Sequence, residues 1–128
     1  MKVLVVDDDA SIRALVTRVF TRRGDKVRSA LDGEAAIACL KAYRFDLVVL
    51  DLMMPRTDGF GVLAYLKTLD GNRPKIIVMT AAVPGLVDKV PSDMVAGVLG
   101  KPFDLQALVT LAENAFPVLG MHSAEMAP

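Results

Sequence analysis

Short apolar runs alternate with longer amphipathic stretches along this 128-residue chain. Five runs predict strands, in chain order at residues 3–6, 26–30, 47–50, 76–79 and 95–99. Most of them are continuous in apolar residues, which is typical of parallel strands buried on both faces. The run at 26–30 is more polar, as an edge strand can be. The pattern therefore predicts a parallel sheet.

Amphipathic helices are predicted between these runs. In the first helix the apolar positions follow the i, i+3, i+4, i+7, i+8 spacing; they are Ile12, Leu15, Val16, Val19 and Phe20. The same spacing recurs between Leu105 and Phe116, and residues 33–42 and 59–69 read as the second and third helices. Gly24 and Gly71 suit the ends of the first and third helices. The alternation of strand and helix predicts an α/β fold with right-handed crossovers.

Two segments break the regular pattern. Residues 83–92 should hold the fourth helix, yet they contain Pro84, Gly85 and Pro91. Because proline removes an interior hydrogen bond, we expect helix four to be short or broken and to end near Val90. Pro117 should end the last helix. We therefore expect one domain over residues 1–116, and a tail or the start of a linker over 117–128.

Composition narrows the class of protein. Hydrophobic residues make up 53% of the chain and the formal net charge is zero, which argues against direct binding of nucleic acid or of a membrane surface. No apolar run approaches the roughly 20 residues of a membrane-spanning helix. The single cysteine, Cys39, excludes an internal disulfide, and the N-terminus lacks a signal-peptide pattern. We expect a cytoplasmic protein.

The candidate chemistry lies at the carboxyl ends of the predicted strands, where open parallel sheets bind ligands. Asp7 and Asp8 follow the first strand and Asp51 the third; Thr80 follows the fourth and Lys101 the fifth. Three converging carboxylates favour a hard divalent cation such as Mg²⁺. A carboxylate beside such a metal can attack phosphorus, while lysine and hydroxyl groups share the phosphoryl charge. These residues therefore suggest phosphorylation of an aspartate.

The residues beside this cluster have simpler interpretations. Asp9 precedes Ala10, the expected first helical residue, so helix capping is favoured over metal binding. Four arginines give the first helix a basic side, namely Arg13, Arg18, Arg22 and Arg23. We interpret that side mainly as a solvated face, with docking of an acidic partner as the alternative.

Four motifs in order make the chain resemble the receiver (REC) domain of two-component response regulators. They are VLVVDDD at 3–9, DLVVLDLMMPRTDGF at 46–60, IIVMTA at 76–81 and GKPFD at 100–104. The resemblance covers about residues 1–116. It implies a doubly wound, flavodoxin-like sheet of strand order 2-1-3-4-5 with helices on both faces.

The resemblance also implies a role for each site residue. Asp51 would be the phosphoacceptor, with Mg²⁺ held by Asp8 directly, by Asp7 through water and by the backbone carbonyl of Met53. Thr80 would hydrogen-bond a phosphoryl oxygen. Lys101 would pair with Asp51 or its phosphate, and the Lys101–Pro102 peptide bond would be cis.

The partners that the resemblance implies are other proteins. The donor would be a phosphohistidine on a sensor histidine kinase or a histidine phosphotransfer protein. A downstream effector or output domain would read the phosphorylated state. The chain would assist its own phosphorylation and dephosphorylation without being a turnover enzyme.

One departure from the family pattern concerns the output surface. The family usually has an aromatic residue three positions before the lysine, and here that position is Val98. Together with the proline-containing segment 83–92, this leads us to expect signalling through another face or a rearranged fourth segment. Ala82 and Met53, where side chains often set the lifetime of the phosphate, can act as neither acid nor base.

Three other readings stay open. An aspartyl-phosphate phosphatase of the haloacid dehalogenase type would want a second aspartate at position 53, where this chain has methionine. A flavodoxin-like FMN-binding protein would want a Ser/Thr/Gly-rich loop after the first strand, where this chain has three aspartates. A degenerate receiver would serve only as a protein-interaction scaffold, although all five chemical residues are present.

Overall fold

A computed structural model describes residues 1–54, 59–71, 73–81 and 93–116 of the chain. Its strands are β1 (Lys2–Val6), β2 (Lys26–Ala30), β3 (Leu47–Asp51), β4 (Lys75–Ala81) and β5 (Val95–Lys101). Its helices are α1 (Ala10–Arg22), α2 (Gly33–Ala42), α3 (Gly59–Lys67) and α4 (Leu105–Ala115). All strand pairs are parallel and the order across the sheet is β2-β1-β3-β4-β5, which confirms the predicted α/β topology.

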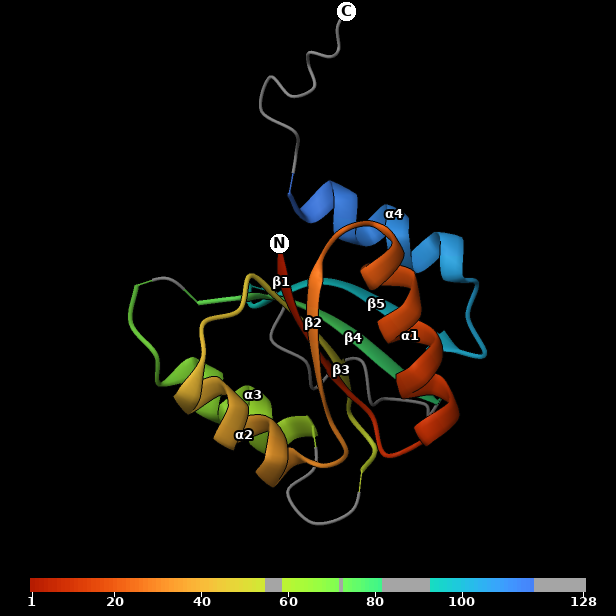
Figure 1. Ribbon diagram of the computed structural model, residues 1–128. Helices are drawn as coiled ribbons and strands as arrows, with labels where there is room; N and C mark the ends of the chain where they lie inside the picture. Colours follow the sequence, from red (N-terminus) through yellow and green to blue (C-terminus); the bar gives the residue numbers. More distant parts are fainter. Residues whose placement is uncertain (55–58, 72, 82–92, 117–128) are drawn as a thin grey trace, which may run out of the picture.

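Helices cover both faces of the sheet (Figure 1). Val3, Val5 and Val49 pack with α1 and α4 in one apolar core, whereas Leu4 and Val48 pack with α2 and α3 in the other. Successive side chains of a strand point to opposite faces, so a strand buried on both sides needs an unbroken apolar run. This explains the continuous hydrophobic sequence of β1 and β3.

Aspartate side chains start three of the helices. Asp9 Oδ1 accepts hydrogen bonds from the backbone N–H groups of Ser11 (2.8 Å) and Ile12 (3.2 Å), which confirms that Asp9 caps α1. Asp32 caps α2 and Asp104 caps α4 in the same way. Gly24, with a φ angle of 94°, directly follows the C-cap of α1, as predicted. Gly71 also has a positive φ angle, 74°, but it lies four residues beyond Lys67, so the prediction that it ends α3 was wrong.

Some boundaries differ from the sequence prediction. Helix α3 ends at Lys67 rather than at residue 69, because Thr68 turns back on Tyr65: its N–H and hydroxyl contact the Tyr65 carbonyl at 3.0 and 2.6 Å. Strands β4 and β5 run two residues further than expected and pair Thr80 with Gly100. Thr80 and Lys101 are therefore held by the sheet itself rather than by loops.

The predicted fourth helix at 83–92 and the predicted tail at 117–128 lie outside the described residues. No helix in the described ranges has the length and apolar character required to cross a membrane. The Lys101–Pro102 peptide bond is cis, as the resemblance implied.

Candidate functional site at the carboxyl edge of the sheet

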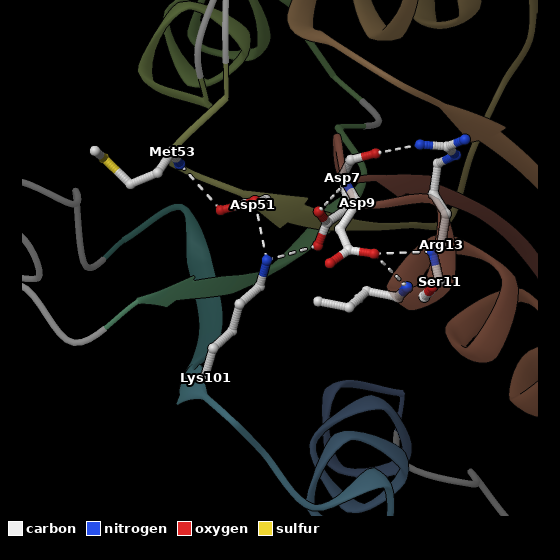
Figure 2. A network of polar contacts seen from close by, with 8 residues as sticks. Asp7, Asp9, Ser11, Arg13, Asp51, Met53 and Lys101 are labelled. Carbon is white, nitrogen blue, oxygen red and sulfur yellow. Dashed lines mark hydrogen bonds and ion pairs between the residues drawn. The ribbon is translucent and has the colours of Figure 1, made fainter.

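Three strands bring charged side chains to one edge of the sheet. Asp7 directly follows β1, Asp51 ends β3 and Lys101 ends β5. The residues two positions earlier on each strand all belong to the core beneath α1 and α4. Because side chains two apart on a strand share a face, the three charged groups point to the same side, and Figure 2 shows them converging.

The lysine bridges both carboxylates. Lys101 Nζ lies 2.8 Å from Asp7 Oδ2 and 3.0 Å from Asp51 Oδ2. The Asp7 residue is 0% exposed and Asp51 is 2% exposed. A charge buried this deeply requires a partner. Lys101 therefore ties the ends of three strands together through their charges.

Burial also contributes to the pKa shifts of Asp51 and Lys101. Burial raises the pKa of Asp51 above its usual value, and the nearby Asp7 charge adds to the rise; hydrogen bonds from Met53 and Lys101 offset only part of it. Burial lowers the pKa of Lys101, but its hydrogen bonds to Asp7 and Asp51 outweigh that effect and raise its pKa overall. The lysine thus stays charged while Asp51 carries a destabilised negative charge.

Asp8 adds a third carboxylate to the same place. Its side chain is exposed, and one ligand oxygen from each of Asp7, Asp8 and Asp51 lies within 4.8 Å of the others. Lys101 can neutralise only one of the three, so negative charge remains in excess. An all-oxygen, negatively charged donor set suits a hard divalent cation such as Mg²⁺. The donor chemistry therefore fits the metal that the sequence suggested.

A buried hydroxyl lies on the strand between β3 and β5. Thr80 is 2% exposed, and its Oγ1 finds no hydrogen-bond partner among the described residues. Its ladder partner, Gly100, directly precedes Lys101. A buried hydroxyl without a partner is costly, so the Thr80 hydroxyl is a candidate donor to a ligand oxygen.

Met53 contacts the site through its backbone. Its N–H donates to Asp51 Oδ1 at 3.0 Å, and its side chain points away from the carboxylates (Figure 2). This hydrogen bond fixes one Asp51 oxygen, while the other receives the Lys101 ammonium. Binding of a metal by the Met53 carbonyl stays a prediction.

The whole arrangement matches one family of proteins. The family model for the response regulator receiver domain matches residues 3–113. The chain belongs to this family. Receiver domains are signalling domains of two-component systems, and the topology, acidic cluster and lysine described above are consistent with that membership.

Several relatives of known name resemble this receiver domain. It is 33% identical over 120 residues to the sporulation initiation phosphotransferase F of Bacillus subtilis, covering 91% of this chain and 94% of that protein. It is 39% identical over 116 residues to the response regulator MprA of Mycolicibacterium vanbaalenii, covering 85% of this chain but 47% of MprA. The solved structure of the response regulator TrrA of Thermotoga maritima in complex with Mg²⁺–BeF has a TM-score of 0.75 at 29% identity, covering 88% and 96% of the two chains.

Sequence reasoning missed one contact that supports the receiver site. Arg13, interpreted as part of a solvated face, donates from Nη1 to the Asp7 carbonyl at 2.9 Å. The Asp9 N–H donates to Asp7 Oδ1, also at 2.9 Å. Together these bonds fix the backbone and one side-chain oxygen of Asp7. An arginine one turn into a helix that follows an aspartate run was the only signal for this contact.

Sequence reasoning also missed the packing of Gly59 behind Asp51. A Cβ at Gly59 would lie 2.4 Å from Leu52 Cα and 2.5 Å from the Asp51 carbonyl oxygen. The Gly59 N–H donates to the Leu52 carbonyl at 3.1 Å. Only glycine lets the start of α3 approach the phosphoacceptor candidate so closely.

Proposed function

We propose that this receiver domain is a phosphoacceptor switch in which Asp51 takes a phosphoryl group from a phosphohistidine. The donor would be a sensor histidine kinase or a histidine phosphotransfer protein. The observation that carries the proposal is the gathering of Asp7, Asp8 and Asp51, with Lys101 bridging two of them. Its nearly full-length relative in Bacillus subtilis is named a phosphotransferase, which supports a phosphorelay role.

In the proposed step, a carboxylate oxygen of Asp51 attacks the phosphorus of the phosphohistidine. The new P–O bond forms as the P–N bond breaks, and the imidazole nitrogen keeps the bonding electron pair. The product is an acyl phosphate on Asp51. The destabilised charge of the buried carboxylate favours its reaction, because transfer spreads that charge over the phosphoryl oxygens.

The remaining site residues have distinct tasks in this step. Lys101 already holds Asp51 at 3.0 Å and would pair with a phosphoryl oxygen, and the Thr80 hydroxyl would donate to another. Asp7, Asp8 and Asp51, with the Met53 carbonyl, would hold Mg²⁺. The bound ion would offset the negative charge of the transferring phosphoryl group. The related TrrA structure, a complex with Mg²⁺–BeF, supports this assignment.

Phosphorylation would act by redistributing charge. An acyl phosphate adds negative charge and strong acceptors beside Lys101, which now divides its hydrogen bonds between Asp7 and Asp51. An effector or output domain would read the change. Val98 packs partly buried against the core under α2 and α3, and segment 83–92 lies outside the described residues. Output through another face or a rearranged fourth segment stays our prediction.

The test is direct phosphorylation of the full chain. We expect acetyl phosphate with Mg²⁺ to add the mass of one phosphoryl group, and Asp51→Asn to abolish the gain. Asp70→Asn, which removes an exposed carboxylate outside the site, should react like the parent chain. Failure to gain mass from both acetyl phosphate and a phosphorylated histidine kinase would favour the scaffold reading. Steady release of phosphate from an added phosphomonoester would favour a phosphatase.

A further inference from the structure

A basic groove lies at the end of the sheet opposite the acidic site. A hollow of about 410 Å³ is lined by the first residues of β1 and β2 and by the turn after α2. Its walls carry four cationic side chains, those of Lys2, Lys26, Arg28 and Arg44. Tyr43 and Phe45 supply the aromatic part of the lining. The strands are parallel, so their first residues lie at the end of the sheet opposite to Asp7, Asp51 and Lys101.

No carboxylate pairs with the cationic side chains of the groove among the described residues. None of the residues that line it is acidic, and among the described residues none of its four cations forms an ion pair. Two acidic residues adjoin the lining along the chain: Asp25 pairs with the Met1 ammonium and Arg23, and Asp46 accepts the backbone N–H of Lys2 at 2.7 Å. The chain as a whole has no net charge, so this is a local concentration of positive charge. It favours an anionic ligand.

One of these cations stacks on an aromatic ring that lines the groove. The Arg28 guanidinium carbon lies 3.7 Å from the centroid of the Tyr43 ring, a stacking distance. Both side chains are exposed. Stacking holds the guanidinium at the wall of the groove while its N–H donors remain available. A carboxylate that binds there therefore meets an arginine whose position is largely set.

The strand beside the groove is an edge of the sheet. Among the described residues β2 pairs only with β1, as Figure 1 shows. The N–H of Lys26 donates to Met1, and the carbonyl of Ala30 accepts from Asp7, so these residues face β1. Backbone groups alternate along a strand, which leaves the N–H and C=O of Val27 and Ser29 facing outward. An added strand would pair with them.

We propose that this groove and the β2 edge bind an extended, acidic segment of a partner protein as an added strand. Lys26 and Arg28 are two residues apart and share one face, so the segment should carry carboxylates at alternate positions. The free backbone edge favours a peptide over a nucleic acid, which has no matching row of N–H and C=O groups. Docking there leaves the phosphoacceptor edge open.

Fluorescence anisotropy with synthetic peptides tests the proposal on the full chain. The probe TEVEVET alternates carboxylates. TQVQVQT removes the charge, and TEEVVET keeps the composition but has no two carboxylates at alternate positions. We expect TEVEVET to bind most tightly. Lys26→Gln with Arg28→Gln should weaken its binding by about tenfold at low salt. The control pair Arg18→Gln with Lys67→Gln removes two exposed charges elsewhere and should leave binding unchanged.

The strand geometry needs its own readout. Ser29→Pro removes an outward N–H but no bond to β1, so the variant should fold and lose most of its affinity for TEVEVET. Amide hydrogen exchange in the parent chain gives an independent measure: TEVEVET should slow exchange at Val27 and Ser29. Asp51→Asn should bind TEVEVET like the parent chain, which separates this proposal from the phosphoacceptor function.

Four results would overturn the proposal. Two concern charge: equal binding of TQVQVQT, and unchanged affinity for TEVEVET after Lys26→Gln with Arg28→Gln. Two concern the type of ligand: unprotected amides at Val27 and Ser29 with TEVEVET bound, and displacement of TEVEVET by a short DNA duplex whose binding needs the same cations. The last result would assign the groove to nucleic acid.

Discussion

At the scale of single residues, three neighbouring aspartates have three different surroundings. Asp7 is buried and bonded to Lys101, Asp8 is exposed beside it, and Asp9 caps α1. Repulsion within the DDD run is avoided because a lysine takes one charge and a helix N-terminus takes another. Only Asp8 has no partner among the described residues, and it is the one best placed to gain from a bound cation.

Substitution of Asp9 should therefore affect stability, whereas substitution of Asp8 should affect phosphorylation. Asp9→Ala should lower the free energy of unfolding by about 1 kcal/mol, since it removes a helix cap. It should leave Mg²⁺-dependent phosphorylation largely intact. Asp8→Ala should abolish that phosphorylation with little loss of stability, because its side chain is exposed. Urea titration and acetyl phosphate labelling measure the two effects. Equal loss of phosphorylation in both variants would contradict this division of roles.

Asp51 should make stability depend on pH in a defined direction. Its pKa is higher in the folded chain than in the unfolded one, so the folded state favours the protonated form and loses stability as pH rises through that window. Asn cannot ionise. Asp51→Asn should thus raise the melting temperature at pH 7 by roughly a few degrees, and the gain should vanish below about pH 4.

Asp70→Asn is the matched control, because it makes the same change at an exposed position. Asp70→Asn should have the melting temperature of the parent chain at pH 7. A gain for Asp51→Asn that stays constant from pH 3 to pH 8, or that grows as the pH falls, would mean that burial of the charge is not its cause.

The place of Asp7, Asp8, Asp51, Thr80 and Lys101 at the carboxyl ends of the strands could be predicted because each one lies at the end of an apolar run, while their roles stay predictions. Arg13 could not, since its bond to the Asp7 carbonyl depends on the angle at which α1 leaves β1. Nor could the sharing of Lys101 between two carboxylates, because that depends on how far β5 extends. Strand ends are readable from sequence, whereas side-chain direction at those ends depends on tertiary packing.

At the scale of elements, two glycines set how closely helices approach the sheet. Gly59 brings α3 against the Asp51–Leu52 backbone, and Gly97 lets α4 lie directly on β5. A Cβ at Gly97 would be 2.6 Å from Leu111 Cδ2. By contrast, no atom outside its chain neighbours lies within 4 Å of a Cβ at Gly100 on the same strand. The pair offers a test of helix–sheet packing.

Gly97→Ala should destabilise the fold by about 1–3 kcal/mol, because the added methyl group overpacks the contact between β5 and α4. Gly100→Ala should change stability by less than about 1 kcal/mol. Adding Leu111→Val to Gly97→Ala should recover part of the loss, which appears as a coupling free energy in a double-mutant cycle. Equal effects of the two glycine variants in urea titrations would place the cause in the backbone rather than in packing.

The elements themselves were largely predictable from periodicity. Burial on both faces imposes unbroken apolar runs on β1 and β3, and the i, i+3, i+4 spacing identifies α1 and α4. Boundaries were less certain: β4 and β5 extend into polar residues because parallel pairing continues there. The basic groove was not foreseen, since its cations come from β1, β2 and the turn after α2 and meet only in the folded chain.

At the scale of the whole molecule, the carboxyl and amino ends of the parallel strands carry opposite charge. The carboxyl end gathers three carboxylates, two of them bridged by Lys101, and the opposite end carries four cations with no acidic residue among the groove's lining. The five residue steps from Lys2 to Asp7, at about 3.3 Å each, separate these sites by roughly 16 Å, beyond the range of strong screened interaction. Phosphorylation and docking would therefore be nearly independent.

Lys101 is the cation that holds the carboxyl edge together. Its bonds link residues at the ends of β1, β3 and β5, so Lys101→Met leaves two buried carboxylates without a cation. We expect the variant to lose about 3 kcal/mol of stability at pH 7–8. Mg²⁺ would supply the missing positive charge. It would also stabilise the variant, because a ligand that binds only the folded state favours that state.

Thermal melts of the parent chain and of Lys101→Met with increasing Mg²⁺ measure whether the metal replaces the lysine. The melting temperature of Lys101→Met should rise more steeply with Mg²⁺ than that of the parent chain, in which Lys101 competes for Asp7 and Asp51. Lys67→Met, which removes an exposed lysine, should follow the parent chain. Parallel Mg²⁺ curves for the parent and Lys101→Met would show that lysine and metal do not share these carboxylates, and that the two cations act at separate places on this edge.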